Sequence, residues 1–166
     1  MRQLCRALAP TTVKETAAAI SLIRPGPAAA GMKEAYIRRR RGLDPVQYLH
    51  PAMADFLGST YGVMLYQEDV MKVATNLAGY TLADADSLRR AVSKARSPDA
   101  FAQEKHRFVT CKSAAAGLAP DLAESIWQAV SRFASYAYCK AHATVYARLA
   151  WMTAWLKAHQ IGRAHV

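Results

Sequence analysis

The chain has 166 residues, a length that fits one domain, and its 52% hydrophobic content argues against a disordered chain. Lys and Arg total 22 against 12 acidic residues, and the resulting net charge of +10 favours a polyanionic partner such as nucleic acid over a membrane surface. Three widely spaced cysteines argue against a disulfide framework and fit a reducing cytoplasm. The longest apolar run is too short to span a bilayer.

Helix signals in the first half predict an all-α domain with little or no sheet. Thr12 and Glu15 have the spacing of a capping box, which opens a helix to about residue 23, and the Arg-Pro-Gly-Pro at 24–27 ends it. A helix is expected over about 32–41, where Gly42 offers a left-handed cap, and a short helix near 52–57. Residues 63–66 are expected to be briefly extended.

Further helices are expected over 67–78, about 81–94, 98–114, 120–133 and from 140 onward, without internal repeats. Gly79 closes the first of these, and prolines open the helices at 98 and 120. The last helix carries an apolar stripe of Val145, Leu149, Met152 and Leu156. Together these helices predict a compact core of Ile20, Leu22, Ile23, Val70, Met71, Leu88, Phe108, Ile126, Trp127, Phe133, Tyr146 and Leu149.

Arg89, Arg90 and Lys94 lie on one expected helix. Arg90 and Lys94 are four residues apart and share a face, and a guanidinium matches two phosphate oxygens at once. A solvated helix end explains the same residues, because cations favour the negative pole of the helix dipole. Spacing alone favours that simpler explanation over a phosphate site.

Lys140 and His142 stand at the expected start of the last helix, just after Tyr136 and Tyr138. Backbone amides at a helix N-terminus attract anions, and these side chains would add donors. A metal site at Cys139-x-x-His142 would need two more ligands that the sequence does not offer. A purely structural histidine is the commoner alternative.

The run Arg38, Arg39, Arg40 and Arg41 suits contact with a phosphate backbone or a solvated helix end equally well. Asp84 and Asp86 point about 200° apart on a helix, so they are not expected to share a metal ion. Glu68-Asp69, in a first helical turn, is likewise expected to favour the helix dipole rather than catalysis. The three tryptophans, Trp127, Trp151 and Trp155, are expected in a core or an interface rather than as platforms for bases.

Short motifs in a fixed order carry a specific resemblance. They are Ser21-Leu22-Ile23-Arg24-Pro25-Gly26-Pro27, Gly31-Met32, Tyr36-Ile37-Arg38-Arg39, Tyr48-Leu49-His50-Pro51, Tyr61-Gly62-Val63, Tyr66-Gln67-Glu68-Asp69-Val70-Met71, Ala78-Gly79-Tyr80, Ala85-Asp86-Ser87-Leu88-Arg89-Arg90-Ala91, Lys140-Ala141-His142-Ala143 and Trp155-Leu156-Lys157-Ala158-His159. Each motif alone is weak, but together they closely resemble the fingers domain of the bacterial DNA polymerase III alpha subunit, the family C replicative polymerase.

This resemblance implies a compact multi-helix fingers domain of an enzyme that extends a DNA primer from deoxynucleoside triphosphates (dNTPs). It implies dNTP binding by Arg89, Arg90, Lys94, Lys140 and His142, and weaker contacts of residues 38–41 with template-primer DNA. The two Mg²⁺ ions of the family are held by palm aspartates that are absent from this chain, so the fragment alone is expected to be inactive. The resemblance also implies that the parent chain has the sliding clamp and other replicase subunits as partners. A membrane is not an expected partner.

The resemblance covers residues 1–159, with Met1 at an internal position of the family, so the chain is expected to be a truncated fragment. Residues 160–166 match nothing in the family and resemble a translated sequencing-adaptor tail. Where relatives commonly have Phe-Asn-Lys-Ser-His, this chain has Tyr138-Cys139-Lys140-Ala141-His142, and Ser93-Lys94-Ala95 replaces a frequent Gly-Lys-Lys. These departures leave both the main replicase and an accessory or error-prone paralogue open as parents.

Two further interpretations stay open on sequence alone. The chain could be a self-sufficient, non-catalytic basic helical protein that binds DNA, or a structural module whose charge serves only solubility. An upstream reading frame that encodes a palm with paired aspartates would support the polymerase. Salt-dependent DNA binding would argue against the structural module.

Overall fold

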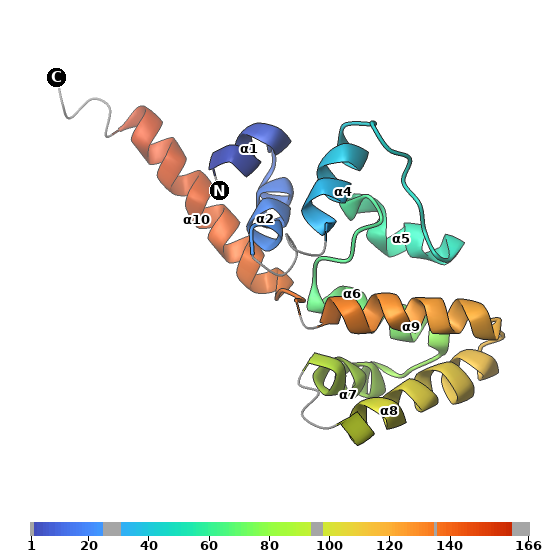
Figure 1. Cartoon of the computed structure of the whole chain (residues 1–166). Helices are drawn as coiled ribbons and strands as arrows, with labels where there is room; N and C mark the ends of the chain where they lie inside the picture. The colour runs from blue at the N-terminus through green and yellow to red at the C-terminus, as the bar shows by residue number, and fades with distance from the viewer. Residues whose placement is uncertain (1, 25–30, 94–97, 135, 161–166) are drawn as a thin grey trace.

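The computed structural model describes residues 2–24, 31–93, 98–134 and 136–160, and within these ranges the chain is helical without a β-strand. The helices, shown in Figure 1, are α1 (Arg2–Leu8), α2 (Val13–Leu22), α4 (Met32–Arg40), α5 (Ala54–Leu57), α6 (Gln67–Ala78), α7 (Leu82–Ser93), α8 (Pro98–His106), α9 (Pro120–Ala134) and α10 (Lys140–His159). Short 3₁₀ turns, Pro51–Met53 and Gly58–Thr60, flank α5. The predicted all-α class is confirmed, and α1 is a helix that the sequence analysis did not predict.

Local signals set several helix ends as predicted. The hydroxyl of Thr12 accepts a hydrogen bond from the backbone N–H of Glu15 at 3.2 Å, which caps the start of α2. The Glu15 carboxylate reaches back to the N–H of Thr11 rather than that of Thr12, at 2.7 Å. Gly79 has φ +63° and ends α6 in the left-handed conformation that favours glycine.

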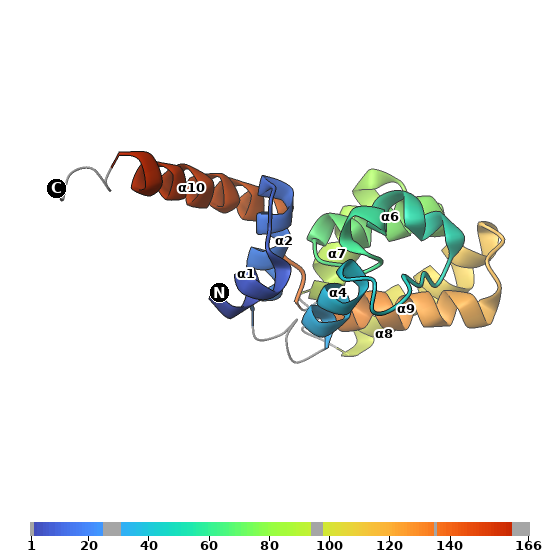
Figure 2. The same ribbon diagram turned by 90° about the horizontal axis from the view of Figure 1, so that it is seen from above.

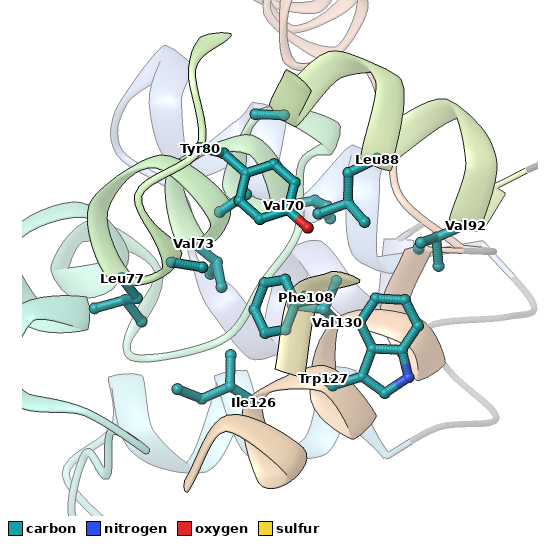
Figure 3. Packing of buried hydrophobic residues seen from close by; sticks show 14 of the residues in the cluster. Val70, Val73, Leu77, Tyr80, Leu88, Val92, Phe108, Ile126, Trp127 and Val130 are labelled. Atoms are coloured by element: carbon teal, nitrogen blue, oxygen red, sulfur yellow. The ribbon is translucent and has the colours of Figure 1, made fainter. Parts of the chain in front are cut away.

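The larger core joins α5, α6, α7 and α9 with the segment that follows α8, Arg107–Ser113. That segment is π-helical, whereas the sequence predicted a continuous α-helix to residue 114. Phe108 lies on it and is fully buried, and Figure 3 shows its ring between Val70, Val130 and Trp127. The ring centroids of Phe108 and Trp127 are 5.6 Å apart.

The smaller core joins α1, α2, α4 and the start of α10. Figures 1 and 2 agree that α10 runs outward from this core with α2 beside it. Of the residues of α10, only Ala143 and Ala147 are buried. Further along α10, Nε1 of Trp151 donates to the hydroxyl of Thr16 at 2.8 Å. None of the helices in the described ranges is both long and apolar enough to cross a membrane.

The predicted core was partly wrong. Leu22, Val70, Leu88, Phe108, Ile126, Trp127 and Phe133 are buried as expected. Ile20 and Met71 are only partly buried, and Ile23, Tyr146 and Leu149 are exposed. The error on α10 arises because its small residues, and not its apolar stripe, face α2, whose own buried face is rich in alanine.

Candidate nucleotide-binding site at the α6–α10 junction

Two segments that are far apart in the sequence meet where α6 and α10 begin. Tyr66 and Tyr138 form an isolated parallel bridge. The N–H of Tyr138 donates to the carbonyl of Leu65 at 3.2 Å, and the N–H of Gln67 donates to the carbonyl of Tyr138 at 2.9 Å. These bonds place the first turn of α6 beside the chain that enters α10, and we call this region the α6–α10 junction.

Acidic residues in the first turn of α6 hold the junction together. One oxygen of the buried Asp69 carboxylate accepts from the backbone N–H groups of Leu65 and Tyr66, each at 2.9 Å. Burial raises the pKa of Asp69 above its usual range, while these two hydrogen bonds act in the opposite direction. Glu68 accepts from the backbone N–H of Lys140 at 3.4 Å. Both carboxylates therefore stabilise the backbone here.

Arg89 reaches the junction from α7. Its Nη1 donates to the side-chain oxygen of Gln67 at 3.1 Å, and its Nε and Nη2 donate to Asp86 at 2.9 and 2.7 Å. The Arg89 side chain is 20% exposed. Because the backbone of Gln67 is bonded to Tyr138, one residue connects the arginine of α7 to the entrance of α10. Arg89 and Lys140, which the family resemblance assigned to one dNTP site, thus both lie beside this junction.

Arg90 is on the outer side of the same cluster. Its Nη2 bonds the second oxygen of Asp86, and its side chain is 59% exposed. Hydrogen bonds from Arg89, ahead of the nearby positive charges, hold the pKa of Asp86 below its usual range. Lys94, the third predicted phosphate ligand of α7, lies outside the described residues.

Lys140 and His142 are both exposed on the first turn of α10. The Lys140 amino group is 5.4 Å from the ring centroid of Tyr66, a cation–π contact. His142 lies between two aromatic rings, with centroids 5.5 Å from Tyr138 and 4.5 Å from Tyr146. A cation that the sequence analysis did not assign to the site also lies here: the guanidinium carbon of Arg24 is 5.1 Å from the Tyr138 centroid.

A cavity of about 380 Å³ opens beside Lys140, between α2, α10 and the turn before α6. Lys14 and Lys140 contribute amino groups to its lining, and Ser59 and Thr144 contribute hydroxyls. Its acidic lining residue, Glu15, is hydrogen-bonded to Arg40 at 2.8 Å. Ala17, Ala18, Tyr36 and Tyr66 also line the cavity, so its wall combines two cationic residues with a larger apolar area.

The four consecutive arginines do not form one surface. Each has a partner within the chain: Arg38 binds Asp44 with two hydrogen bonds of 2.7 Å, Arg39 donates to the carbonyl of Tyr61 at 3.0 Å, Arg40 binds Glu15, and Arg41 donates to the carbonyl of Ala7 at 2.7 Å. Arg38 and Arg41 are exposed, whereas Arg39 and Arg40 are partly buried. These bonds tie α4 to α1, to α2 and to the loop before α6.

The carboxylates of α7 do not suit a metal ion. Asp84 accepts from Thr81 at 2.7 Å and from Arg107 at 2.5 Å, while Asp86 is held by two arginines. Within the described ranges, no group of three or more His, Cys, Asp or Glu residues could hold a metal ion. The family resemblance assigns Mg²⁺ to palm aspartates outside this chain, and the carboxylates of α7 are no substitute for them.

Sequence analysis missed the residues that connect the site. Gln67 and Asp86 were quoted as parts of two motifs, and Asp86 was otherwise considered and rejected as a metal ligand. Neither local spacing nor charge could show that Gln67 bonds Arg89 on one side and Tyr138 on the other. For Arg24, the Arg-Pro-Gly-Pro motif was the only feature of the sequence that could have pointed to a place in the site.

The described part of the chain is thus a helical domain in which Arg89, Lys140 and His142 lie around the start of α6 and α10. Residues 1–116 match the family described as the bacterial DNA polymerase III alpha subunit finger domain. The chain belongs to this family.

Relatives under two names are similar to the chain. They include an error-prone DNA polymerase of Symbiobacterium thermophilum, 40% identical over 95% of the chain, and DNA polymerase III alpha subunits of Aquifex aeolicus and Pseudomonas aeruginosa, 36% and 39% identical over 96% of it. The chain spans 14% of the length of each of these curated relatives. It is therefore similar to one part of a DNA polymerase.

Proposed function

We propose that the chain serves, within a family C DNA polymerase, to bind the triphosphate of the incoming dNTP while template-primer DNA is extended. The observation that carries the proposal is the link through Gln67, which brings Arg89 of α7 beside the entrance of α10. Arg89, Arg90, Lys140 and His142 are then the phosphate ligands, together with Lys94 beyond the described residues.

The chemistry of these groups supports a polyphosphate ligand. Arginine offers paired N–H donors that match phosphate oxygens, and lysine adds a compact positive charge. The first turn of α10 supplies backbone N–H groups of the kind that bind anions at helix starts. Arg89, Arg90 and Lys140 place three positive charges around the junction, and Asp86 and Glu68 lie beside them. The oxygens of a triphosphate would compete with these carboxylates for the cations, whose electrostatic stabilisation is a main contribution to phosphoryl transfer.

Contact with template-primer DNA is a separate part of the proposal. The chain's net charge of +10 favours DNA phosphates, and the exposed Arg38 and Arg41 are the members of the arginine run that can reach a strand. Their bonds to Asp44 and Ala7 would have to exchange for phosphate oxygens. Replacing both with alanine should flatten the salt dependence of DNA binding by the full-length polymerase.

The nucleotidyl transfer itself belongs to the parent enzyme in this proposal. Its palm aspartates would hold two Mg²⁺ ions that stabilise the attacking and leaving oxygens. The parent would act in the cytoplasm with the sliding clamp and other replicase subunits. Both parents that the sequence leaves open, a main replicase and an error-prone paralogue, would use the junction in the same way.

Substituting Arg89 with alanine in the full-length polymerase tests the triphosphate role. We expect the KM for dNTP to rise, or kcat to fall, by roughly tenfold or more while DNA affinity stays unchanged. The matched control is Arg107→Ala, because Arg107 also pairs with an aspartate of α7 but lies on the π-helical segment. Unchanged kinetics for Arg89→Ala, or an equal loss for Arg107→Ala, would contradict the proposal.

A further inference from the structure

One carboxylate of α7 holds two arginines in different ways. Oδ1 of Asp86 accepts from Nε and Nη2 of Arg89, whereas Oδ2 accepts from Nη2 of Arg90. The Asp86 side chain is itself about one-third exposed. Since a single anion lies between two cations, the cluster keeps a net positive charge for a ligand.

The contacts of Arg89 leave part of its guanidinium for a ligand. An arginine has five N–H groups, and three of those of Arg89 donate to Asp86 and Gln67. Among the contacts within the described ranges, one N–H on each terminal nitrogen is then left over. These N–H groups can still donate to the oxygens of a phosphate ligand.

Arg90 is held less firmly than Arg89. It shares one hydrogen bond with Asp86 and is mostly exposed, and an exposed ion pair of this kind contributes little in water. A polyphosphate carries more negative charge than one carboxylate, so it can draw Arg90 away from Asp86. Arg89 has three bonds to two partners and would keep its orientation.

We propose that Asp86 is a positioning residue for nucleotide binding: it orients the guanidinium of Arg89 toward the triphosphate and keeps Arg90 beside it. The inference rests on the proposed function of the junction. A positioning role can be told apart from simple charge balance. An aspartate that only cancelled positive charge would weaken triphosphate binding, whereas an aspartate that positions Arg89 strengthens triphosphate binding.

The test is Asp86→Asn in the full-length polymerase, with steady-state kinetics for dNTP on a primed template. Asparagine keeps the size of the side chain but removes the charge that holds both arginines. We expect the KM for dNTP to rise roughly tenfold, the scale of one charge-assisted hydrogen bond to the ligand, with DNA affinity unchanged. A KM that falls or stays the same would overturn the inference.

Asp84→Asn is the matched control. It removes the same charge from the same helix, but the partner of Asp84 is Arg107 on the π-helical segment. We expect its KM for dNTP to match that of the wild type. An equal rise in both variants would show a general effect of net charge or of helix stability, and would also overturn the inference.

Two further variants separate this inference from the proposed function. Asp86→Glu keeps the charge and should recover most of the wild-type KM, and it remains informative if the asparagine variant fails to fold. In the double variant of Asp86→Asn with Arg89→Ala, the increase in KM for dNTP should be clearly smaller than the two single effects combined, because both substitutions disable the same guanidinium. If Arg89→Ala raises KM and Asp86→Asn does not, only the inference fails; if Arg89→Ala has no effect, the proposed function fails too.

Discussion

The backbone of Gly62 lies against that of Gln47 so closely that a Cβ atom at position 62 would be 2.8 Å from the Gln47 carbonyl oxygen. Gly62 also has φ +73°, in the left-handed region that L side chains rarely adopt. It lies at the start of the segment that leads into α6. The approach of these two residues therefore fixes how the chain reaches the α6–α10 junction.

Gly62→Ala should lower the free energy of unfolding by about 2 kcal/mol or more, because alanine adds left-handed strain and a contact below van der Waals distance. Gly58→Ala is the control, since Gly58 has φ −57° and a methyl group there would meet nothing within 4 Å. Urea unfolding of both variants checks the difference. Similar losses at the two positions would contradict the close approach to Gln47.

Phe108→Ala should cost about 3–5 kcal/mol of unfolding free energy, because Phe108 is fully buried and packs on Trp127 and Tyr80. Leu82→Ala, at a side chain that is 72% exposed, should change it by less than about 0.5 kcal/mol. Chemical unfolding followed by circular dichroism measures both. A small loss for Phe108→Ala would mean that the π-helical segment does not close the larger core.

The sequence predicted most helix positions because their ends have local causes. Thr12, Gly79 and Pro120 act on neighbouring backbone groups, so their effect is visible in a short stretch of sequence. The π-helical segment was not predicted, because the proline that opens the helix at residue 98 does not show which hydrogen-bond pattern the helix adopts further along. The family resemblance grouped Arg89 with Lys140, but the bonds of Gln67 to Arg89 and to Tyr138 were not predicted, because they join residues far apart in the chain.

The predicted site residues illustrate the same limit. Charge and motif order picked out Arg89 and Lys140, and the structure shows them at one junction. The sequence left the arginine run at 38–41 open between DNA contact and a solvated helix end, and in the structure its members bond to four different parts of the chain. Charge counts show how many cations are present, but the partners of each depend on the tertiary fold.

Asp84 should contribute to a loss of stability in acid. A hydrogen bond from Thr81, followed by one from Arg107, holds the pKa of Asp84 below its ordinary value of 3.8. A lowered pKa in the folded state adds stability that is present above pH 3.8 and disappears as the pH falls through the folded value. The melting temperature of Asp84→Asn should thus lie below that of the wild type at pH 7, and the two should converge in strong acid.

Asp69 should behave in the opposite way. Burial raises its pKa above the ordinary value of 3.8, so the folded state binds a proton more readily than the unfolded chain. The stability due to this titration is present below pH 3.8 and is lost as the pH rises through the folded value. A carboxyl NMR titration should place Asp69 above 3.8 and Asp84 below it. The reverse order would contradict the burial of Asp69.

α10 is apolar on two sides, and only contact with α2 decides which side is covered. Ala143 and Ala147 are fully buried, whereas Val145, Leu149, Met152 and Leu156 of the predicted stripe are exposed. Small side chains on both helices let the two backbones approach closely, because interaxial distance depends on the residues at the contact. Spacing along α10 alone gave no means of choosing between the two sides.

A larger side chain at the α2–α10 contact should therefore be harmful at one position and harmless at the next turn. Ala147→Leu should lower the free energy of unfolding by about 1–3 kcal/mol through overpacking against α2. Ala150→Leu, on the exposed surface of the same helix, should change it by less than about 0.5 kcal/mol. Urea unfolding of the two variants provides the comparison. If Ala150→Leu is instead the destabilising change, α10 packs against α2 through a different face. The first turn of α10, at the α6–α10 junction, would then be rotated as well.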